Sequence, residues 1–571
     1  MTKRKKTFLI VLSVLLAITI GALFTINGIV AGIISKKADA YLATHPVKNY
    51  NVSYGRIGFN LLNRSAKIID ITLTPKTAYL DSLSRSGLSY LIPEITSGKI
   101  VVAGIDYKNI FSGNNLNISK IRIHKLHVIL RKISGRKKEN TTTKTKKSKI
   151  PESFKVKGLN SLRINSFLLD KSKFELIDQK TGNIIAASQN IELEVKNFVL
   201  LPLENKPSFF KPDYDDVILV IKDTRYFTPD KLYEIMLGNI AAGLKTKKFV
   251  ATKVEYRPLY SKSEFTKHLK YQQERYDVKI GSIEFYIPDP VSLINDNTLL
   301  IHNVTINKAN INIFRDKQIP FPHFKRPLLP HQALKHMKLM LNVDTLILKN
   351  SKFAYEELTG RNKQPLFVNF KKLSAEITNI SNIPRRKYSQ SKMRAALHGR
   401  LMGKAPFNLN LVFPMMARND TMTFQGEILG KVPFKIFNKA SFPAAGINFR
   451  GGTLNKLTFT GGANPRYSKG TLTMLYNNVK LDFVKKGKQK ADKFLSWGAT
   501  TVIRKDNPPA GKPPKKAVMT YTRDMEKGFG NFLWKTVFSG MKGTFIGGKK
   551  SFVQPDKKQK KNRKSRKKTG R

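Results

Sequence analysis

Cysteine is absent from all 571 residues of the chain. This absence excludes disulfide scaffolds, zinc ribbons and thiol nucleophiles. It does not identify a redox compartment, because a chain without cysteine is stable on either side of a membrane.

Acidic residues are few, with 39 Asp and Glu against 103 Lys and Arg and a net charge of +64. Such an excess attracts anionic partners, either nucleic acid or acidic lipid head groups. The basic residues run along the whole chain, and no helix-turn-helix, RRM or zinc-finger pattern accompanies them. We therefore expect a preference for acidic lipid and no nucleic-acid partner.

Catalytic signatures are also missing. The sequence has no G-x-S-x-G elbow, and no pair of carboxylates stands out from the surface acids. Residues 543–549 approach a phosphate-binding loop, but Lys550 stands where a Ser or Thr must hold magnesium. The sequence therefore predicts that the chain is not an enzyme and has no cofactor.

Histidine pairs offer no metal site either. His124 and His127 are three apart on an expected strand, a spacing that places the two rings on opposite faces. His331 and His336 are five apart, which misses a shared helix face. We expect no bound metal.

Charged residues are missing from Phe8 to Ile34, directly after the basic segment TKRKK at 2–6. About 20 apolar residues span a bilayer, and flanking lysines keep the N-terminus in the cytoplasm. The alternative is a cleaved signal peptide, with an apolar core of about 7–15 residues and a small-x-small site. The run here is longer, and the polar residues 35–37 offer no clear site. We expect a cytoplasmic segment at 1–7, a transmembrane anchor at 8–34 and an exported remainder.

Period two dominates the rest of the chain. Residues 191–196 alternate apolar and charged side chains, as a half-buried strand does. The same alternation recurs at 121–124, 310–313, 408–411, 456–459 and 471–474. Helical patterns are scarce, and only 229–244 and 326–341 are expected to form short helices. The pattern predicts a mainly β body.

One internal repeat is visible. Residues 164–174 read INSFLLDKSKF and residues 343–353 read VDTLILKNSKF, and each copy continues through a Thr-Gly turn into another strand. Residues 117–130 and 304–314 are weaker copies. A strand unit that repeats in this way indicates an elongated, solenoid-like sheet.

Linkers and an apolar segment complete the chain. The loop at 131–149 and the tail at 549–571 are strongly basic, and 506–516 is rich in proline. We expect the tail to be disordered. Residues 525–546 are apolar except for a narrow polar stripe at helical spacing: Asn531, Lys535, Ser539 and Lys542. This predicts a C-terminal helix, either docked on the β body or in contact with a membrane or partner.

Three segments resemble a known family. They are the opening strands NYNVSYGRIGFNLLNRSAKIIDITLTP at 49–75, the repeats described above, and the region 446–545, which includes GINFRGGTLNKLTFTGG and AVMTYTRDMEKGFGNFLWKTVFSGMKGTF. Together they are similar to the AsmA-like family of Gram-negative envelope proteins, the relatives of AsmA and TamB. The basic loop and the basic tail depart from the family pattern.

The resemblance implies a single transmembrane helix followed by an elongated, curled, antiparallel β-sheet with an apolar groove. It implies an inner-membrane protein whose bulk lies in the periplasm, with phospholipid as partner and an outer-membrane or envelope protein at the C-terminal end. The expected parts are a repetitive groove region at 35–390, a C-terminal β-region at 391–524 and the apolar helix.

Such a groove needs an apolar occupant, because a sheet with one uncovered apolar face is otherwise unfavourable. The expected function is phospholipid transport between the two membranes or outer-membrane homeostasis. The alternative is a non-conducting scaffold or assembly factor for outer-membrane proteins. The candidate groove residues are Ile191, Leu193, Val195, Ile311, Ile313, Leu373, Ile377, Leu409, Leu411, Leu457 and Phe459.

Overall fold

The computed structural model describes residues 47–60, 64–106, 115–135, 154–155, 160–203, 206–359, 365–383, 392–415, 420–483 and 503–545. The predicted N-terminal segment, transmembrane anchor and basic tail lie outside these stretches, as does most of the basic loop. Of the helices within them, none is long and apolar enough to cross a membrane.

The chain divides into two compact units. Unit 1 comprises Met1–Leu259 and Ser282–Leu300, and unit 2 comprises Tyr260–Gly281 and Ile301–Arg571. The chain passes from one unit to the other three times: between Leu259 and Tyr260, within β13 (Glu274–Tyr286) and within β14 (Thr298–Asn307). The division expected between residues 390 and 391 lies inside unit 2.

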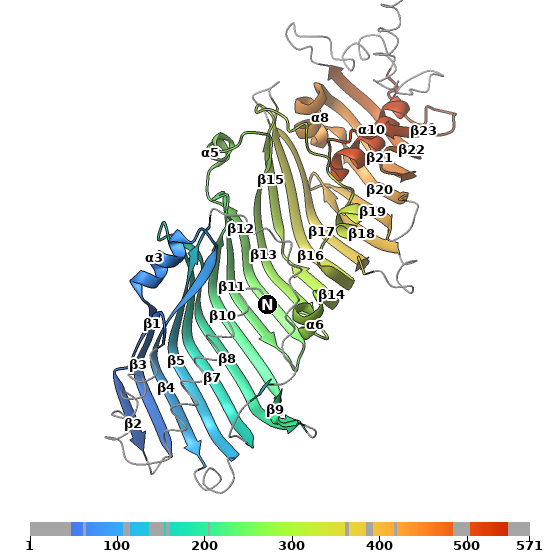
Figure 1. Cartoon of the computed structure of the whole chain (residues 1–571). Helices are drawn as coiled ribbons and strands as arrows, with labels where there is room; N and C mark the ends of the chain where they lie inside the picture. The colour runs from blue at the N-terminus through green and yellow to red at the C-terminus, as the bar shows by residue number, and fades with distance from the viewer. Residues whose placement is uncertain are drawn as a thin grey trace, which may run out of the picture. The chain divides into compact units, whose positions relative to one another are not determined.

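Unit 1 is a sheet of long strands that lie side by side (Figure 1). Along the sheet, β3 pairs with β4, and the ladder continues through β5, β7, β8, β10, β11 and β12. The short strands β1 and β2 pair with β3, β9 pairs with β8, and β6 pairs with β9. The elements are β1 (Tyr50–Ser53), β2 (Arg56–Asn60), β3 (Ser65–Pro75), α3 (Thr77–Arg85), β4 (Tyr90–Ile105), β5 (Asn115–Ile133), β6 (Phe154–Lys155), β7 (Ser161–Asp178), β8 (Ile184–Leu203), β9 (Lys206–Asp213), β10 (Asp216–Phe227), β11 (Tyr233–Gly243), β12 (Lys248–Pro258) and α6 (Val291–Asp296).

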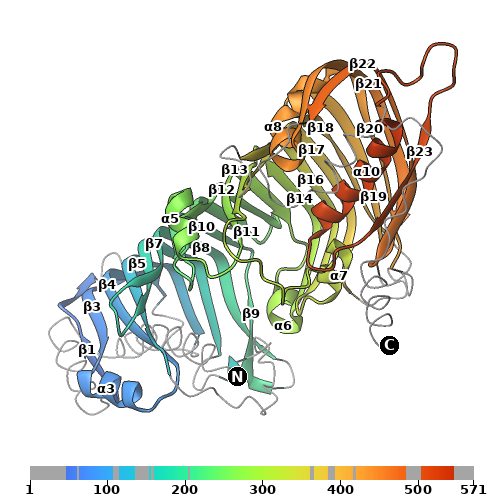
Figure 2. The same cartoon turned by 90° about the horizontal axis from the view of Figure 1, so that it is seen from above.

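Unit 2 continues the same design with more helical cover. Its ladder runs from β15 through β16 to β22 in chain order and ends at β23. Figure 2 shows these strands curving, with α10 on the inner side of β19–β23. The elements are α5 (Lys262–Lys267), β15 (Asn310–Asp316), α7 (Pro330–Lys335), β16 (Met340–Leu358), β17 (Leu366–Ser381), β18 (Lys392–Leu401), β19 (Ala405–Pro414), β20 (Met422–Pro433), η1 (Phe434–Phe437), α8 (Asn438–Ala445), β21 (Ile447–Ala463), β22 (Tyr467–Phe483), β23 (Lys516–Thr522) and α10 (Phe529–Phe545).

The chain is therefore mainly β with a few short helices, as predicted, but the sheet is mixed. The expectation of a purely antiparallel sheet is wrong, because β5 pairs with β7 and β15 pairs with β16 in parallel. Strand alternation carries no information about direction, so the pattern alone does not reveal these pairs.

Of the three predicted helices, the C-terminal one is confirmed and the one at 326–341 is confirmed in part. The apolar C-terminal segment forms α10, and 326–341 contains the short helix α7. The prediction of a helix at 229–244 is wrong, because this segment forms strand β11. Gly238 weakens a helix there, and β10 and β12 on either side satisfy the backbone of β11.

A row of left-handed backbone conformations crosses the sheet of unit 1. On neighbouring strands, the residue pairs before and after each left-handed residue show that it lies opposite another left-handed residue or a glycine. The residues with positive φ are Asp70, Lys125, Lys171, Asn190, Asp223 and Lys253, and the strands between them carry Gly98 and Gly238. A Cβ on Gly238 would lie 2.9 Å from Cβ of Lys253, so this row also needs glycine for close approach.

Each of these residues shifts the in-out alternation by one. In β5, Ile121 and Ile123 are buried before Lys125, whereas Leu126 is buried directly after it. The apolar face is therefore continuous in space, although the alternation of apolar and polar residues in the sequence is displaced by one position, as at a β-bulge.

The strain of this row is testable at Lys253, where φ is +51°. Lys253→Val is expected to lower the free energy of unfolding by about 1–2 kcal/mol, because a β-branched residue is poorly accommodated at positive φ. Lys253→Gly is expected to leave the free energy of unfolding nearly unchanged, because the relief of backbone strain offsets the larger conformational entropy that glycine loses on folding. Chemical denaturation measures both. The control is Lys248→Val on the same strand at ordinary φ, and an equal loss there would contradict the explanation.

The internal repeat is a structural repeat. Its copies are β7 and β16, and Lys171 and Asn350 occupy equivalent positions with φ of 48° and 50°. The next residue is a buried serine in both, and its hydroxyl donates to the carbonyl two residues earlier, Ser172 at 3.1 Å and Ser351 at 2.9 Å. Each copy has a parallel strand on one side and an antiparallel strand on the other.

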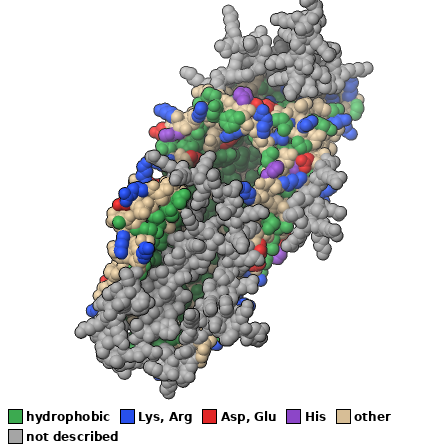
Figure 3. Space-filling model, viewed as in Figure 1, with side chains coloured by type: hydrophobic (Ala, Val, Ile, Leu, Met, Phe, Trp, Pro, Cys, Tyr) green, Lys and Arg blue, Asp and Glu red, His purple; other side chains and the backbone are tan. Residues whose placement is uncertain are grey.

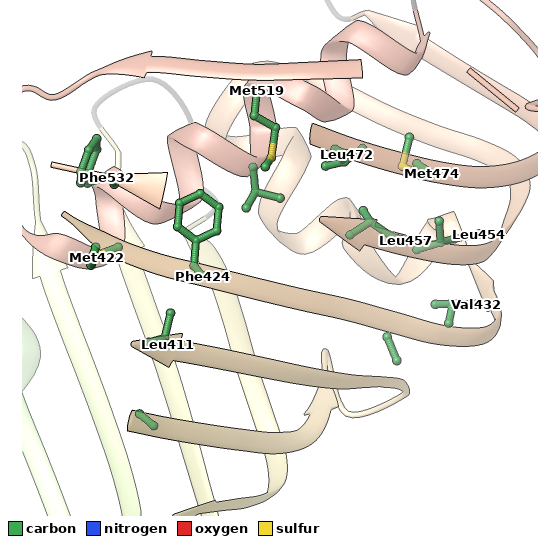
Figure 4. Close-up of a cluster of buried hydrophobic side chains, with 14 of the residues drawn as sticks. Leu411, Met422, Phe424, Val432, Leu454, Leu457, Leu472, Met474, Met519 and Phe532 are labelled. Carbon is green, nitrogen blue, oxygen red and sulfur yellow. The ribbon is translucent and has the colours of Figure 1, made fainter. Parts of the chain in front are cut away.

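The largest packed core lies in unit 2 beneath α10. Figure 4 shows Phe532 of α10 with Phe424 of β20, Leu472 and Met474 of β22 and Met519 of β23. The helix sits close to the sheet because Gly540 has no side chain, and a Cβ there would lie 2.6 Å from Met519 Cγ. The described part of unit 1 has two smaller clusters, one from β4, β5, β7 and β8 and one from β3, β4 and β5.

Candidate functional site

Apolar side chains form continuous rows across the sheet of unit 1. Residues paired directly in a ladder share one face, so pairing defines each row. One row runs through Ile123, Leu169, Leu193, Leu219, Ala242 and Phe249, one from each of six strands. Beyond the left-handed row, a second runs through Leu130, Leu176, Ala186, Tyr226, Ile235 and Tyr256.

These rows lie on the same face. Ile123, Leu126 and Val128 of β5 all pack in one cluster, although the left-handed Lys125 lies between the first and the second. The apolar face thus extends along the strands as well as across them.

Much of this face is only partly covered. No residue of β10 is buried, and in β11 only Tyr233 and Glu234 are. The apolar residues of β10–β12 belong to none of the buried clusters found in the described part of the chain. Apolar faces that the protein covers only in part over several strands are typical of surfaces that bind an apolar partner.

The predicted groove residues fall into two groups. Ile191, Leu193, Val195, Ile311, Ile313 and Leu373 are half-buried and lie outside the packed clusters. Leu411 and Leu457 are buried within the core beneath α10, and Ile377, Leu409 and Phe459 pack against that core. Protein side chains therefore already cover the second group, and the first group carries the candidate groove.

A second stretch of apolar face lies on unit 2 and ends in charged residues. Ladder pairing joins Val278, Ile311, Phe353 and Phe370 in one row and Tyr276, Ile313, Tyr355 and Val368 in the next. The row after these contains Glu274, Arg315 and Glu357. In Figure 3, hydrophobic side chains line a hollow over β15–β17 where grey atoms leave it in view.

Ion pairs and a phenol hold this charged end together. Arg315 lies 2.9 Å from the Glu274 carboxylate, and Lys317 lies 2.6 Å from the Glu357 carboxylate. The Tyr355 hydroxyl donates to Glu357 at 2.7 Å, and Glu357 is only 7% exposed. Burial and the neighbouring Glu357 raise the pKa of Tyr355, so this phenol stays protonated.

Helix α10 carries two lysines, Lys535 and Lys542, and Lys535 lies near enough to Lys317 and Glu357 for their charges to affect its pKa. Its outer face carries Trp534, 52% exposed, stacked on Phe538 at 5.4 Å, and Lys542 Nζ lies 4.9 Å from the Phe538 ring. Burial and the charge of Lys535 lower the pKa of Lys542 to about 8. Crowding by surrounding atoms and the charge of Lys317 also lower the pKa of Lys535, although Glu357 works against this.

The sequence-based prediction missed this charged end. The sequence did contain a pattern that indicates these charges. Arg315 follows Ile311 and Ile313 at a spacing of two, and Glu357 follows Phe353 and Tyr355 at the same spacing. Extending the period-two rule by two residues places both charges on the groove face.

The histidine pair of β5 needs a correction. The prediction that His124 and His127 point to opposite faces is wrong, because the left-handed Lys125 resets the alternation between them. Both contact carboxylates of β7: His124 Nδ1 lies 2.6 Å from Asp170, and His127 Nε2 lies 3.5 Å from Glu175. No group of three or more His, Cys, Asp or Glu is placed to hold a metal in the described part of the chain.

His331 is a fully buried titratable group. It is 0% exposed in the core of unit 2, its ring nitrogens have no hydrogen-bond partner, and Asp420 is 3.8 Å away. Burial lowers its pKa, Asp420 works to raise it and Lys335 adds to the lowering.

We therefore expect a pH-dependent stability. A folded state that keeps His331 neutral is fully stable above the ordinary histidine pKa of about 6.5, and stability is lost as the pH falls below it toward the lowered folded pKa. Denaturation between about pH 7.5 and 5 measures this slope. His331→Leu should flatten it, and an unchanged slope in that variant would assign the dependence to other groups.

Comparison with models of known protein families and with curated proteins finds no match for the chain.

Proposed function

We propose that the chain is an AsmA-like, membrane-anchored envelope protein that binds phospholipid acyl chains along the apolar face of its sheet and serves lipid transport. The observation that carries this proposal is the partly covered apolar face across β8, β10, β11 and β12 of unit 1. Acyl chains offer the long, unbranched apolar surface that such a face can cover. The large net positive charge suits the phosphates of lipid head groups. In this proposal the protein acts by binding and not by catalysis.

Lipid captured with the protein tests the proposal. Mass spectrometry of the detergent-extracted chain should find bound phospholipid. A photocrosslinker at Leu193 or Leu219 should label lipid, whereas one at Glu192, which is exposed on the opposite face of β8, should not. Absence of lipid, or equal labelling on both faces, would favour a non-conducting scaffold.

The proposed location has its own test. With residues 8–34 as an inner-membrane anchor and residues 1–7 in the cytoplasm, a periplasm-active reporter fused after Lys550 should function. Activity of a cytoplasm-only reporter at the same position would overturn the location.

A further inference from the structure

A proline-rich segment of unit 2, residues 317–329, is fixed at its start by one buried side chain. Gln272 is 8% exposed, and its Nε2 donates to the carbonyls of Lys317 at 3.2 Å and of Ile319 at 2.8 Å. The backbone N–H of Gln272 donates to the carbonyl of Pro320 at 2.9 Å. These three hydrogen bonds fix the first half of the segment against the residues that precede β13.

The second half of this segment is held by the residues just before α10. The Arg523 guanidinium donates to the carbonyl of Pro327. The Glu526 carboxylate accepts a hydrogen bond from Arg326 at 3.1 Å, and its other oxygen lies 3.0 Å from His323 Nδ1. Arg523 is only 5% exposed, so this end of the segment is tied to the protein interior. Contacts of both halves therefore hold the side chains between them in a fixed arrangement.

Several apolar side chains of this region are exposed. Phe324 is 67% exposed, and its ring meets the ring of Tyr271, which is 36% exposed, edge-on at 5.3 Å. Leu328 is 46% exposed in the same segment. Met525 is 42% exposed and directly precedes Glu526, whose ion pairs bind the segment. We call Tyr271, Phe324, Leu328 and Met525 the exposed apolar patch, because exposed apolar side chains that gather in this way mark interaction sites.

The charges beside this patch are positive. Lys325 and Lys270 are exposed, and Lys270 Nζ lies 5.6 Å from the centroid of the Tyr271 ring. Residues 317–329 contain no Asp or Glu. The nearby Glu526 carboxylate is already engaged in two ion pairs. The exposed apolar patch is therefore flanked by cationic side chains that can contact an anionic partner.

This combination limits the kind of partner. At a membrane interface, aromatic and aliphatic side chains enter the head-group region, while lysines beside them contact acidic head groups. A single-stranded nucleic acid would instead require a series of aromatic rings on which its bases stack. Leu328 and Met525 are aliphatic and suit acyl chains better than bases. A bilayer that contains anionic lipid therefore matches both the apolar side chains and the charge.

We propose that the exposed apolar patch docks unit 2 on the surface of a bilayer that contains anionic phospholipid, with Lys325 and Lys270 at its head groups. This inference goes beyond the proposed function, because the partner is a bilayer surface and not a lipid that lies on the sheet. Charge complementarity between the two lysines and acidic lipid carries the choice of partner.

A single fluorescent label can test this site, because the chain has no cysteine. Leu328→Cys in the full-length protein, held in amphipol, accepts an environment-sensitive fluorophore at one position. Vesicles of phosphatidylcholine and phosphatidylglycerol in equal parts, with a quencher attached to some of the acyl chains, should quench this label. Vesicles of phosphatidylcholine alone with the same quencher should need about tenfold more lipid, since two lysines beside an acidic membrane account for at least a factor of this size.

Substitutions in the labelled protein separate the apolar and the charged contributions. Phe324→Ser should raise the lipid concentration for half-maximal quenching by about tenfold with either vesicle, because an inserted aromatic ring is lost. Lys325→Gln should raise it by about fivefold, and only with phosphatidylglycerol present. The matched controls are Leu201→Ser in β8, where Leu201 is 47% exposed, and Lys469→Gln, an exposed lysine of β22. Both should leave the lipid concentration unchanged.

The other outcomes would each overturn a part of this inference. No quenching by either vesicle, with phospholipid still co-purified, would overturn the docking patch and leave the proposed function standing. Quenching that is unchanged by both Phe324→Ser and Lys325→Gln would also overturn the patch, because the membrane would then reach Leu328 without it. An equal response to both vesicles would overturn the preference for anionic lipid. The same fluorescence change with DNA in place of vesicles, at similar concentrations, would assign a nucleic-acid partner instead.

Discussion

Leu193→Asp is expected to reduce the phospholipid bound by the full-length protein by about tenfold or more. An acyl chain that covers this position would have to strip water from the carboxylate, which is costly, and otherwise it could not lie on this part of the face. Leu193 lies at the centre of a six-strand row, between Leu169 and Leu219. It is half-buried and belongs to no packed cluster, so the folded state should survive the change. Mass spectrometry of co-purified lipid measures the loss.

Two matched variants separate this effect from others. Lys196→Asp introduces the same side chain on the exposed face of the same strand, and it should leave lipid binding intact. Leu409→Asp should instead destabilise the protein, because Leu409 packs against the core of unit 2. Normal lipid content in folded Leu193→Asp protein would exclude the unit 1 face as the binding surface.

Single histidines should matter little by comparison. His127→Ala removes one contact with Glu175 and no part of the apolar face. If it abolished function at normal protein levels, a discrete reactive site would explain the protein better than a groove does.

The strand pattern of the sequence was sufficient to predict the mainly β fold and the C-terminal helix. Residues 191–196 alternate cleanly and form part of β8, because neighbouring strands on both sides leave one face apolar and one polar. The repeat at 164–174 and 343–353 likewise marks two equivalent strands.

Other features depend on contacts that alternation does not encode. A left-handed residue such as Lys125 shifts the alternation of apolar and polar residues by one position. In the sequence this shift looks like a break in the strand pattern, although the apolar face is continuous in the structure. The segment at 229–244 has helical spacing, but pairing with β10 and β12 overrides it. The groove candidates of β19 and β21 have the same alternation as those of β8, and only the position of α10 shows that they are covered.

The covering helix leads to the largest expected effect on stability. Phe532→Ala should lower the free energy of unfolding of unit 2 by about 3–5 kcal/mol, the usual cost of removing a fully buried aromatic side chain. Phe532 is 1% exposed, and its ring lies 6.1 Å from Tyr521 and 5.8 Å from the Arg523 guanidinium. The cavity would open between α10 and the sheet, where Gly540 already brings the two into close contact.

Denaturation and amide hydrogen exchange of β22 and β23 measure this loss, because these strands lie directly against α10. Trp534→Ala is the matched control: it removes an aromatic ring of the same helix that is half-exposed, and it should change stability by no more than about 0.5 kcal/mol. Exchange in β10–β12 of unit 1 should be unchanged in both variants. Equal losses for Phe532→Ala and Trp534→Ala would mean that α10 does not dock through its buried face, so this helix would not cover the groove candidates Leu411 and Leu457.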